Sequence, residues 1–462
     1  ALKNTTIGRG GIIMDIMKIV DFLNNILWNN ILIWLLLFTG LYFSIRLRFP
    51  QIRQLKRINQ YVFGGIFKKG EKAGDDGMSS FQALATAIAA QVGTGNLAGV
   101  ATAIASGGPG AVFWMWISAF LGMGTIFGEA VLAQKYVDRI DGEATGGPAY
   151  YLSKGVHSKF LAVFFAISII IALGFVGNMV QSNSIAIALN SAFNIPNIVG
   201  GLIAAIFAGL IFIGGISRIA SFTELIVPFM AILYITGSIV IMVLNYTQII
   251  PAFKTIFTSA FTVQAAVGGA IGVTVKEAVR YGISRGLFSN EAGMGSTPHA
   301  HAVAKVDHPA EQGLVAIFGV IFDTLVICTI TALINIMTGA YTMGLTGIEM
   351  TQTAFSIGLG KFGIKFVAIS LFFFAFSTII GWYYFGESNI KYLFGKKGIK
   401  YYRALVLVFI VLGSVLSVDS VWKVADLFNG LMVLPNIAGL LILSPQVVAT
   451  LKDYENNFLA NK

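Results

Sequence analysis

Long apolar stretches dominate the pattern of hydrophobic and polar positions along this chain of 462 residues. A membrane-spanning helix needs about 20 mostly apolar residues, and eleven stretches meet that requirement. They are too long for strands, and they lack the short alternation of an outer-membrane barrel. The pattern therefore predicts an all-α polytopic membrane protein with eleven transmembrane helices, near residues 21–45, 80–106, 110–135, 160–190, 196–215, 219–244, 265–300, 310–338, 361–390, 399–418 and 421–450.

The composition agrees with a membrane protein. Charged residues make up 11% of the chain, less than half of the roughly 25% that keeps a soluble domain wet. The chain has 52 glycines, which suit helices that approach closely in lipid. Cys328 is the only cysteine, so the chain cannot form an internal disulfide. These numbers exclude a soluble enzyme, a disordered protein and a disulfide-rich secreted domain.

Lysine and arginine gather in alternate loops between the predicted spans. Eight basic residues lie between Arg46 and Lys72, whereas the loops 107–112, 191–197 and 339–360 have none and 245–260 has only Lys254. Basic loops remain cytoplasmic. We therefore expect a multi-pass protein of the cell membrane with its N-terminus outside and its C-terminus in the cytoplasm. The net charge of +10 belongs to this cytoplasmic face, so nucleic acid is not an expected partner.

We expect one transmembrane domain at residues 21–450, between an N-terminal tail at 1–20 and a cytoplasmic C-terminal tail at 451–462. The first methionine is Met14, so residues 1–13 are interpreted as an added or processed end outside the fold.

Two regions of the chain resemble each other. Asn96 and Asn290, 194 residues apart, each begin an Asn-x-Ala-Gly motif, and the next spans carry Glu129 and Asp323 at the same offset. The predicted repeats are 80–244 and 265–450, each with five spans. Because five is odd, the second repeat has the inverted topology found in many secondary transporters. The 21–45 span is then an addition to a five-plus-five core.

The first span of each repeat is interrupted by glycines and polar residues. Gly93, Thr94 and Gly95 lie in the middle of the 80–106 span, and residues 285–293 repeat the pattern in the 265–300 span. A helix break in lipid leaves amides and carbonyls that need polar partners. The half-helix after such a break directs N–H groups at a carboxylate, and the half-helix before it directs carbonyls at a cation. The alternative, that the glycines only permit close packing, is favoured for Gly99 and Gly122.

Other polar residues within the spans leave two readings open. Asn178, Gln181 and Asn183 could bond neighbouring helices or line a pocket. Ser377 and Thr378 could bond back to their own helix or, if they pass the first break, bind sodium.

The intramembrane carboxylates and histidines are further candidates for functional groups. Each carboxylate needs a partner; Glu129 and Asp323 are interpreted as structural, and Glu291, within the second break, as functional. His299 and His301 lack further ligands at metal-binding spacing.

The sequence resembles the alanine/glycine:cation symporter family, the sodium:alanine symporters, from the first span to the last. The resemblance rests on the blocks 40–50, Val92–Val100, Gly107–Trp116, Arg285–Gly295 and Phe376–Trp382. This family is similar to the amino-acid transporters of five-plus-five inverted-repeat fold. The resemblance implies a sodium site with carbonyl ligands from Ala89 and Val92 and hydroxyl ligands from Ser377 and Thr378.

The predicted function is sodium-coupled symport of alanine and glycine by alternating access. Substrate contacts are expected from both breaks, from span 160–190 and from large side chains that wall a small pocket: Thr94, Gly95, Asn96, Phe175, Gln181, Ser289, Asn290, Glu291, Gly293, Met294 and Trp382. Sodium is the coupling ion, and no cofactor, catalytic residue or obligate protein partner is expected. The alternatives are a gated channel for ions or small solutes and a membrane-embedded enzyme.

Overall fold

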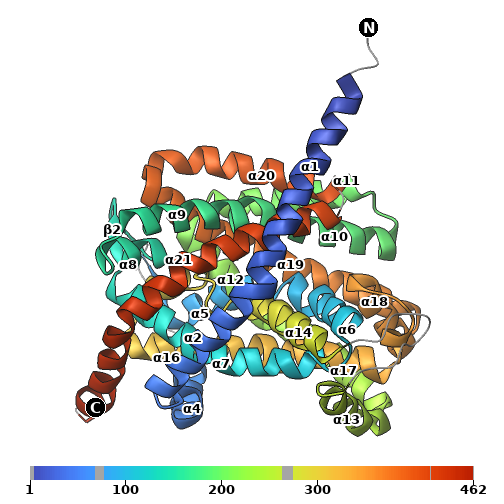
Figure 1. Ribbon diagram of the computed structural model, residues 1–462, viewed down its shortest axis with the longest axis horizontal. Helices are drawn as coiled ribbons and strands as arrows, with labels where there is room; N and C mark the ends of the chain where they lie inside the picture. The colour runs from blue at the N-terminus through green and yellow to red at the C-terminus, as the bar shows by residue number, and fades with distance from the viewer. Residues whose placement is uncertain (1–4, 68–76, 263–273, 417, 461–462) are drawn as a thin grey trace.

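The computed structural model describes residues 5–67, 77–262, 274–416 and 418–460. Nearly all of this part of the chain is helical, and the helices pack side by side in one bundle from which α1 (Thr5–Ile26) projects (Figure 1). The apolar core runs through the bundle, while many large apolar side chains point outward, as expected for a surface in contact with lipid.

The helices follow the predicted segments in order. The predicted span 21–45 comprises the end of α1, the π-helix η1 (Leu27–Leu32) and α2 (Ile33–Arg46), and it is followed by α3 (Pro50–Arg53) and α4 (Leu55–Phe67). The first predicted repeat contains α5 (Ser80–Gln91), η2 (Gly95–Gly99), α6 (Val100–Gly107), α7 (Ala111–Lys135), α8 (Pro148–Lys154), α9 (Lys159–Ile169), η3 (Ile170–Gly177), α10 (Asn178–Phe193), α11 (Asn197–Phe212) and α12 (Gly215–Leu244).

The second predicted repeat follows η4 (Tyr246–Gln248) and α13 (Ile249–Ser259). It contains α14 (Val275–Asn290), α15 (Pro298–Ala302), α16 (Pro309–Val320), η5 (Ile321–Cys328), α17 (Thr329–Met337), η6 (Ala340–Thr342), α18 (Gly347–Leu359), α19 (Lys361–Phe394), η7 (Lys396–Gly398), α20 (Ile399–Val415), α21 (Val418–Asp453) and η8 (Tyr454–Phe458).

Eight helices in the described residues are long and apolar enough to cross a membrane, and the bent pair α5 and η2–α6 would make a ninth. The other two predicted spans correspond to α11 and α14, which have 16 residues each, and part of the predicted span 265–300 lies outside the described residues. The chain is therefore a nearly all-helical, multi-pass membrane protein, while the count of eleven spans and the five-plus-five repeat stay predictions.

The first helix break lies where the glycines predict it. Helix α5 ends at Gln91, Val92 is extended, and a helix resumes at Gly95 with a bend of 49°. The start of α5 is fixed by a capping box, in which the Ser79 hydroxyl accepts from the Gln82 amide and the Gln82 side chain accepts from the Ser79 amide.

The second break lies later than predicted. Helix α14 is continuous through Gly286, which packs so closely on α7 that an added Cβ would lie 2.7 Å from Ser118 Oγ. The chain leaves the helix only at Glu291, where φ is 59°, and Gly293 and Gly295 also have positive φ. The prediction of a break beginning at Arg285 was wrong, because Gly286 serves close packing and only the later glycines redirect the backbone.

A short parallel strand pair joins the ends of the two broken segments. Strand β1 (Met78–Ser79) directly precedes α5, strand β4 (Ala304–Lys305) closely follows α15, and Ser79 pairs with Lys305. The pair lies on the face that the basic loops predict to be cytoplasmic. The other pair, β2 (Asp138–Ile140) and β3 (Glu143–Thr145), is a local antiparallel hairpin.

Candidate substrate and sodium sites

The four residues proposed for sodium meet where α19 crosses the first break. Thr378 Oγ1 lies 3.0 Å from the Ala89 carbonyl oxygen and 3.3 Å from that of Val92, and Ser377 Oγ lies 3.3 Å from the Ala89 oxygen. Both hydroxyls are fully buried. Each is also within hydrogen-bond distance of the Phe374 carbonyl in its own helix, so both readings of the Ser-Thr pair are geometrically open.

Two glycines allow α19 to approach the break this closely. A Cβ on Gly93 would lie 2.4 Å from Thr378 Oγ1, and one on Gly381 would lie 3.1 Å from Ala90 backbone atoms. The contact therefore brings two carbonyl and two hydroxyl oxygens together in a buried place. Hard cations take oxygen ligands of this kind, so the residues fit a sodium ion.

Thr94, Asn96 and Gln181 form the polar lining of the first break. The Asn96 side-chain oxygen accepts from the Gly93 amide at 2.8 Å, and the Gln181 side-chain oxygen accepts from the Thr94 amide at 3.2 Å. The Thr94 hydroxyl is buried and has no hydrogen-bond partner among the described residues. An unpartnered buried hydroxyl at a helix break is a group that a polar ligand can satisfy.

Asp323 links the two broken segments. Its carboxylate accepts from Asn96 Nδ2 at 2.6 Å, from Ser289 Oγ at 3.0 Å and from Thr324 Oγ1 at 2.7 Å. An added Cβ on Gly95 would lie 3.3 Å from Ser289 Cα, so the two breaks are also in direct contact. These bonds give the Asp323 carboxylate the polar partners that it needs, and its structural role stays a prediction.

The amides of the second break donate hydrogen bonds to Glu129. Its carboxylate accepts from the amides of Gly293 and Gly295 at 3.0 and 2.9 Å and from Asn436 Nδ2 at 2.7 Å. At the end of α14, Gln91 Nε2 donates to the Asn290 carbonyl at 2.7 Å. In this structure the second break is thus satisfied by protein groups, and substrate contacts from Gly293 and Asn290 stay predictions.

The carboxylate of Glu291 is hydrogen-bonded to the indole of Trp382. Trp382 Nε1 donates to Glu291 Oε1 at 2.6 Å, and Ser296 donates to the other carboxylate oxygen. The indole packs edge-on against Phe288 and so closely on Gly177 that a Cβ there would lie 2.8 Å from the ring. The position of Trp382 is therefore fixed on three sides.

The roles of two predicted pocket residues, Phe175 and Met294, stay predictions. The Phe175 ring packs on Tyr402 and Phe409 of α20, and its place in the pocket wall stays a prediction. Met294 is buried beside the second break, and its place in the pocket wall stays a prediction. Asn183 Nδ2 donates to carbonyls at the end of α20, which is the helix-bonding reading of this amide.

The buried histidines are engaged with protein groups. His299 stacks between Phe165 and Phe385, and His301 Nδ1 lies 2.8 Å from Gln312 Nε2. No group of three metal-ligating side chains occurs in the described part of the chain.

Two amides that matter at the breaks, Gln91 and Asn436, were not singled out from the sequence. Asn436 donates to Glu129 and also to the Gly293 carbonyl at 2.9 Å. Both are uncharged amides within apolar spans, and this placement was the available signal.

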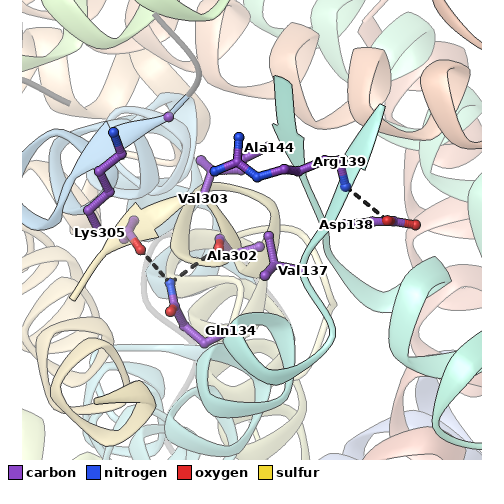
Figure 2. A pocket seen from close by; sticks show the side chains of 10 residues that line it. Gln134, Val137, Asp138, Arg139, Ala144, Ala302, Val303 and Lys305 are labelled. Carbon is purple, nitrogen blue, oxygen red and sulfur yellow. Dashed lines mark hydrogen bonds between the residues drawn. The ribbon is translucent and has the colours of Figure 1, made fainter. Parts of the chain in front are cut away.

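A cavity of about 450 Å³ lies beside the strand pair β1–β4, on the face predicted to be cytoplasmic (Figure 2). Gln134 of α7 points toward the end of α15 and the segment that follows it, and donates to the carbonyls of His301, Ala302 and Ala304 at 2.5, 3.2 and 2.8 Å. These bonds and the strand pair together fasten the ends of the two broken segments.

Comparison with known proteins identifies the family. Residues 14–462 match the sodium:alanine symporter family. The chain belongs to this family. A sodium/alanine symporter of Methanococcus maripaludis, AgcS, is 44% identical over 450 residues, which cover 96% of this chain and 98% of the relative. A probable sodium/glutamine symporter of Bacillus subtilis, GlnT, is also 44% identical and covers 96% and 92%.

The structural comparison supports the fold alone. A manganese transporter of Eremococcus coleocola superposes with a TM-score of 0.50 at 15% identity, over 80% of this chain and 78% of that one. As a member of the sodium:alanine symporter family, this chain is a multi-pass membrane transporter and not an enzyme.

Proposed function

We propose that this chain is a sodium-coupled symporter of small neutral amino acids, alanine and glycine, that works by alternating access across the cell membrane. The observation that carries the proposal is the buried contact of the Ser377 and Thr378 hydroxyls with the Ala89 and Val92 carbonyl oxygens. It lies at a helix break, where the free carbonyls of α5 can bind a cation and the following half-helix can bind an anion.

The substrate is placed beside this cation, between the two breaks. Its carboxylate binds the amide end near Gly95 and Asn96, and the Thr94 hydroxyl is the nearby group with an unused hydrogen bond. Ser289 contacts Gly95 from the other broken segment and closes the site. The remaining proposed contacts, besides Trp382, are Phe175, Gln181, Asn290, Glu291, Gly293 and Met294.

The pocket is small because Trp382 walls it. The indole is held by Glu291 and backed by Gly177, so it cannot move aside without loss of a buried hydrogen bond. One methylene too many in a tight cavity costs about 1–3 kcal/mol. Alanine and glycine are therefore accepted and larger side chains rejected.

Coupling to sodium supplies the energy for accumulation. Alanine is a zwitterion, so the membrane potential alone does little work on it. One co-transported cation gains about 2.3 kcal/mol per 100 mV. A tenfold sodium gradient adds about 1.4 kcal/mol. At one-to-one coupling these terms together support accumulation by roughly several hundredfold.

The test is uptake of labelled alanine into proteoliposomes with sodium or choline outside. Sodium-dependent uptake above the equilibrium level is expected. Glutamine belongs among the competitors, because a relative bears the name of a probable sodium/glutamine symporter. Uptake that never exceeds equilibrium, with currents far above carrier turnover, would favour the gated channel instead.

A further inference from the structure

A second cavity, of about 210 Å³, lies between α1, α14 and α21, at the end of the bundle opposite the strand pair β1–β4. The positive-inside pattern predicts this end to be extracellular. The rim of the cavity is exposed: Asp21 and Lys423 form an ion pair at 2.9 Å with side chains 50% and 45% accessible. The inner end is Phe288, which is 6% exposed. The cavity lining thus runs from exposed side chains at the surface to a buried one beside the second break.

The cavity walls carry both signs of charge. Arg285 of α14 stands over the Trp422 ring at 5.3 Å, and its nearest carboxylate oxygen, on Asp426, is 3.7 Å away. That distance is beyond a hydrogen bond. Arg285 Nε also has no hydrogen-bond partner among the described residues. The guanidinium therefore holds donors that the protein does not use, in a partly buried place where a carboxylate would satisfy them.

The cavity adjoins the proposed substrate site through one side chain. The Phe288 ring contacts Trp422, which lies beside the cavity, at 5.2 Å between centroids. On the other side it contacts Trp382, the proposed pocket wall, at 6.2 Å. Phe288 is also the direct neighbour of Ser289, which contacts Gly95 in the first break. Phe288 therefore separates the outer cavity from the inner site.

We propose that the outer cavity is a second binding site for an amino-acid zwitterion, occupied before the substrate passes Phe288. Arg285 binds the carboxylate, and the carboxylate of Asp426 receives the ammonium group. The cavity is far larger than the roughly 10–15 Å³ of probe space that one water needs. Its lining has a single hydroxyl–carbonyl contact, from Ser284 to Tyr281 within α14, and not the two hydroxyl and two carbonyl oxygens that meet at the inner site, so binding here does not require sodium. That the occupant is alanine rests on the proposed function.

The test uses Ser284, which lines the cavity, as a reporter. The only native cysteine, Cys328, is buried, so Ser284→Cys introduces the one accessible thiol. The full chain in lipid nanodiscs is labelled with a maleimide at increasing alanine concentrations, in sodium and in choline. Protection of Ser284→Cys by alanine is expected in both media. Lys276→Cys, exposed on the same helix but outside the cavity lining, should show no protection.

Arg285→Gln tests the carboxylate contact within the Ser284→Cys chain. Loss of a charge-assisted hydrogen bond should raise the alanine concentration for half-protection by about tenfold or more. Lys276→Gln removes one positive charge from an exposed position on α14 and should leave the alanine concentration for half-protection unchanged. Acetate and methylamine, which carry one charge each, should protect less than alanine at equal concentration.

Three results would overturn the outer site: protection that disappears in choline, equal half-protection in Arg285→Gln and Lys276→Gln, or equal protection by acetate. Each of them is compatible with sodium-driven alanine uptake. Absence of such uptake, with protection in choline intact, would instead refute the proposed function.

Discussion

Gly93→Ala is the substitution that most directly tests the proposed sodium site. The added Cβ would lie 2.4 Å from Thr378 Oγ1 and 3.1 Å from Gln181 Oε1, whereas real Cβ contacts stay beyond 3.0 Å. The Thr378 hydroxyl or the break must therefore shift by at least 0.6 Å, the difference between 3.0 and 2.4 Å. Ligand distances at a hard cation vary by only a few tenths of an ångström, so a shift of this size separates the hydroxyl from the carbonyls.

The expected cost follows from overpacking, which is typically about 1–3 kcal/mol. If this cost destabilises the sodium-bound state alone, the sodium concentration for half-maximal alanine uptake rises by about 5- to 150-fold. The assay is initial uptake into proteoliposomes over a range of sodium concentrations. Gly99→Ala is the matched control. The close packing expected for Gly99 is not found, because an added Cβ would have its nearest neighbour atom 3.9 Å away, so the sodium dependence should be unchanged. A folded Gly93→Ala variant with wild-type sodium dependence would refute the assignment.

Three further predictions concern the hydroxyls, the pocket wall and the strand pair. Ser377→Ala with Thr378→Val removes two oxygens of the proposed site and should raise the sodium requirement for uptake; an unchanged requirement would assign the hydroxyls to their own helix. Trp382→Leu should lessen the preference for alanine over leucine in competition assays, by up to about tenfold, and an intact preference would remove the indole from the wall. A disulfide between Ser79→Cys and Lys305→Cys, which are paired positions on neighbouring strands, should stop uptake until it is reduced, because it locks the ends of both broken segments together.

The control for that cross-link is the other strand pair. Arg139 and Ala144 face each other across the β2–β3 hairpin, which lies within the first predicted repeat and connects no broken segment. A disulfide between Arg139→Cys and Ala144→Cys should leave uptake unchanged. If both cross-links stop uptake, or neither does, separation of strands β1 and β4 is not a step that transport requires.

The sequence was sufficient for the helical, multi-pass architecture and the family, because long apolar runs and extended motif blocks are local signals. The first break was also predictable, since Gly93 and Gly95 flank Thr94 in the middle of an apolar span. The second break was misplaced, because a glycine for close packing, Gly286, looks the same in sequence as one with positive φ, such as Gly293.

Partners across long distances could not be derived from local patterns. Glu129 was expected to need a partner, yet nothing in the sequence indicated the amides of Gly293 and Gly295, more than 160 positions away. Likewise, Glu291 was correctly placed within the second break, but its bond to Trp382 depends on how α19 packs. The strand pair β1–β4 has only two residues on each side, too few for any periodic pattern.

The central claim is that a sodium ion moves with each neutral amino acid, and its most direct test is the dependence of alanine accumulation on voltage. Proteoliposomes with a fixed sodium gradient are clamped at different potassium diffusion potentials, and the steady-state ratio of labelled alanine is measured. One-to-one coupling predicts a rise of about tenfold for each 59 mV of interior-negative potential, the equivalent of one charge moved. An alanine ratio that does not change with the potential, or accumulation that persists when choline replaces sodium, would contradict the account.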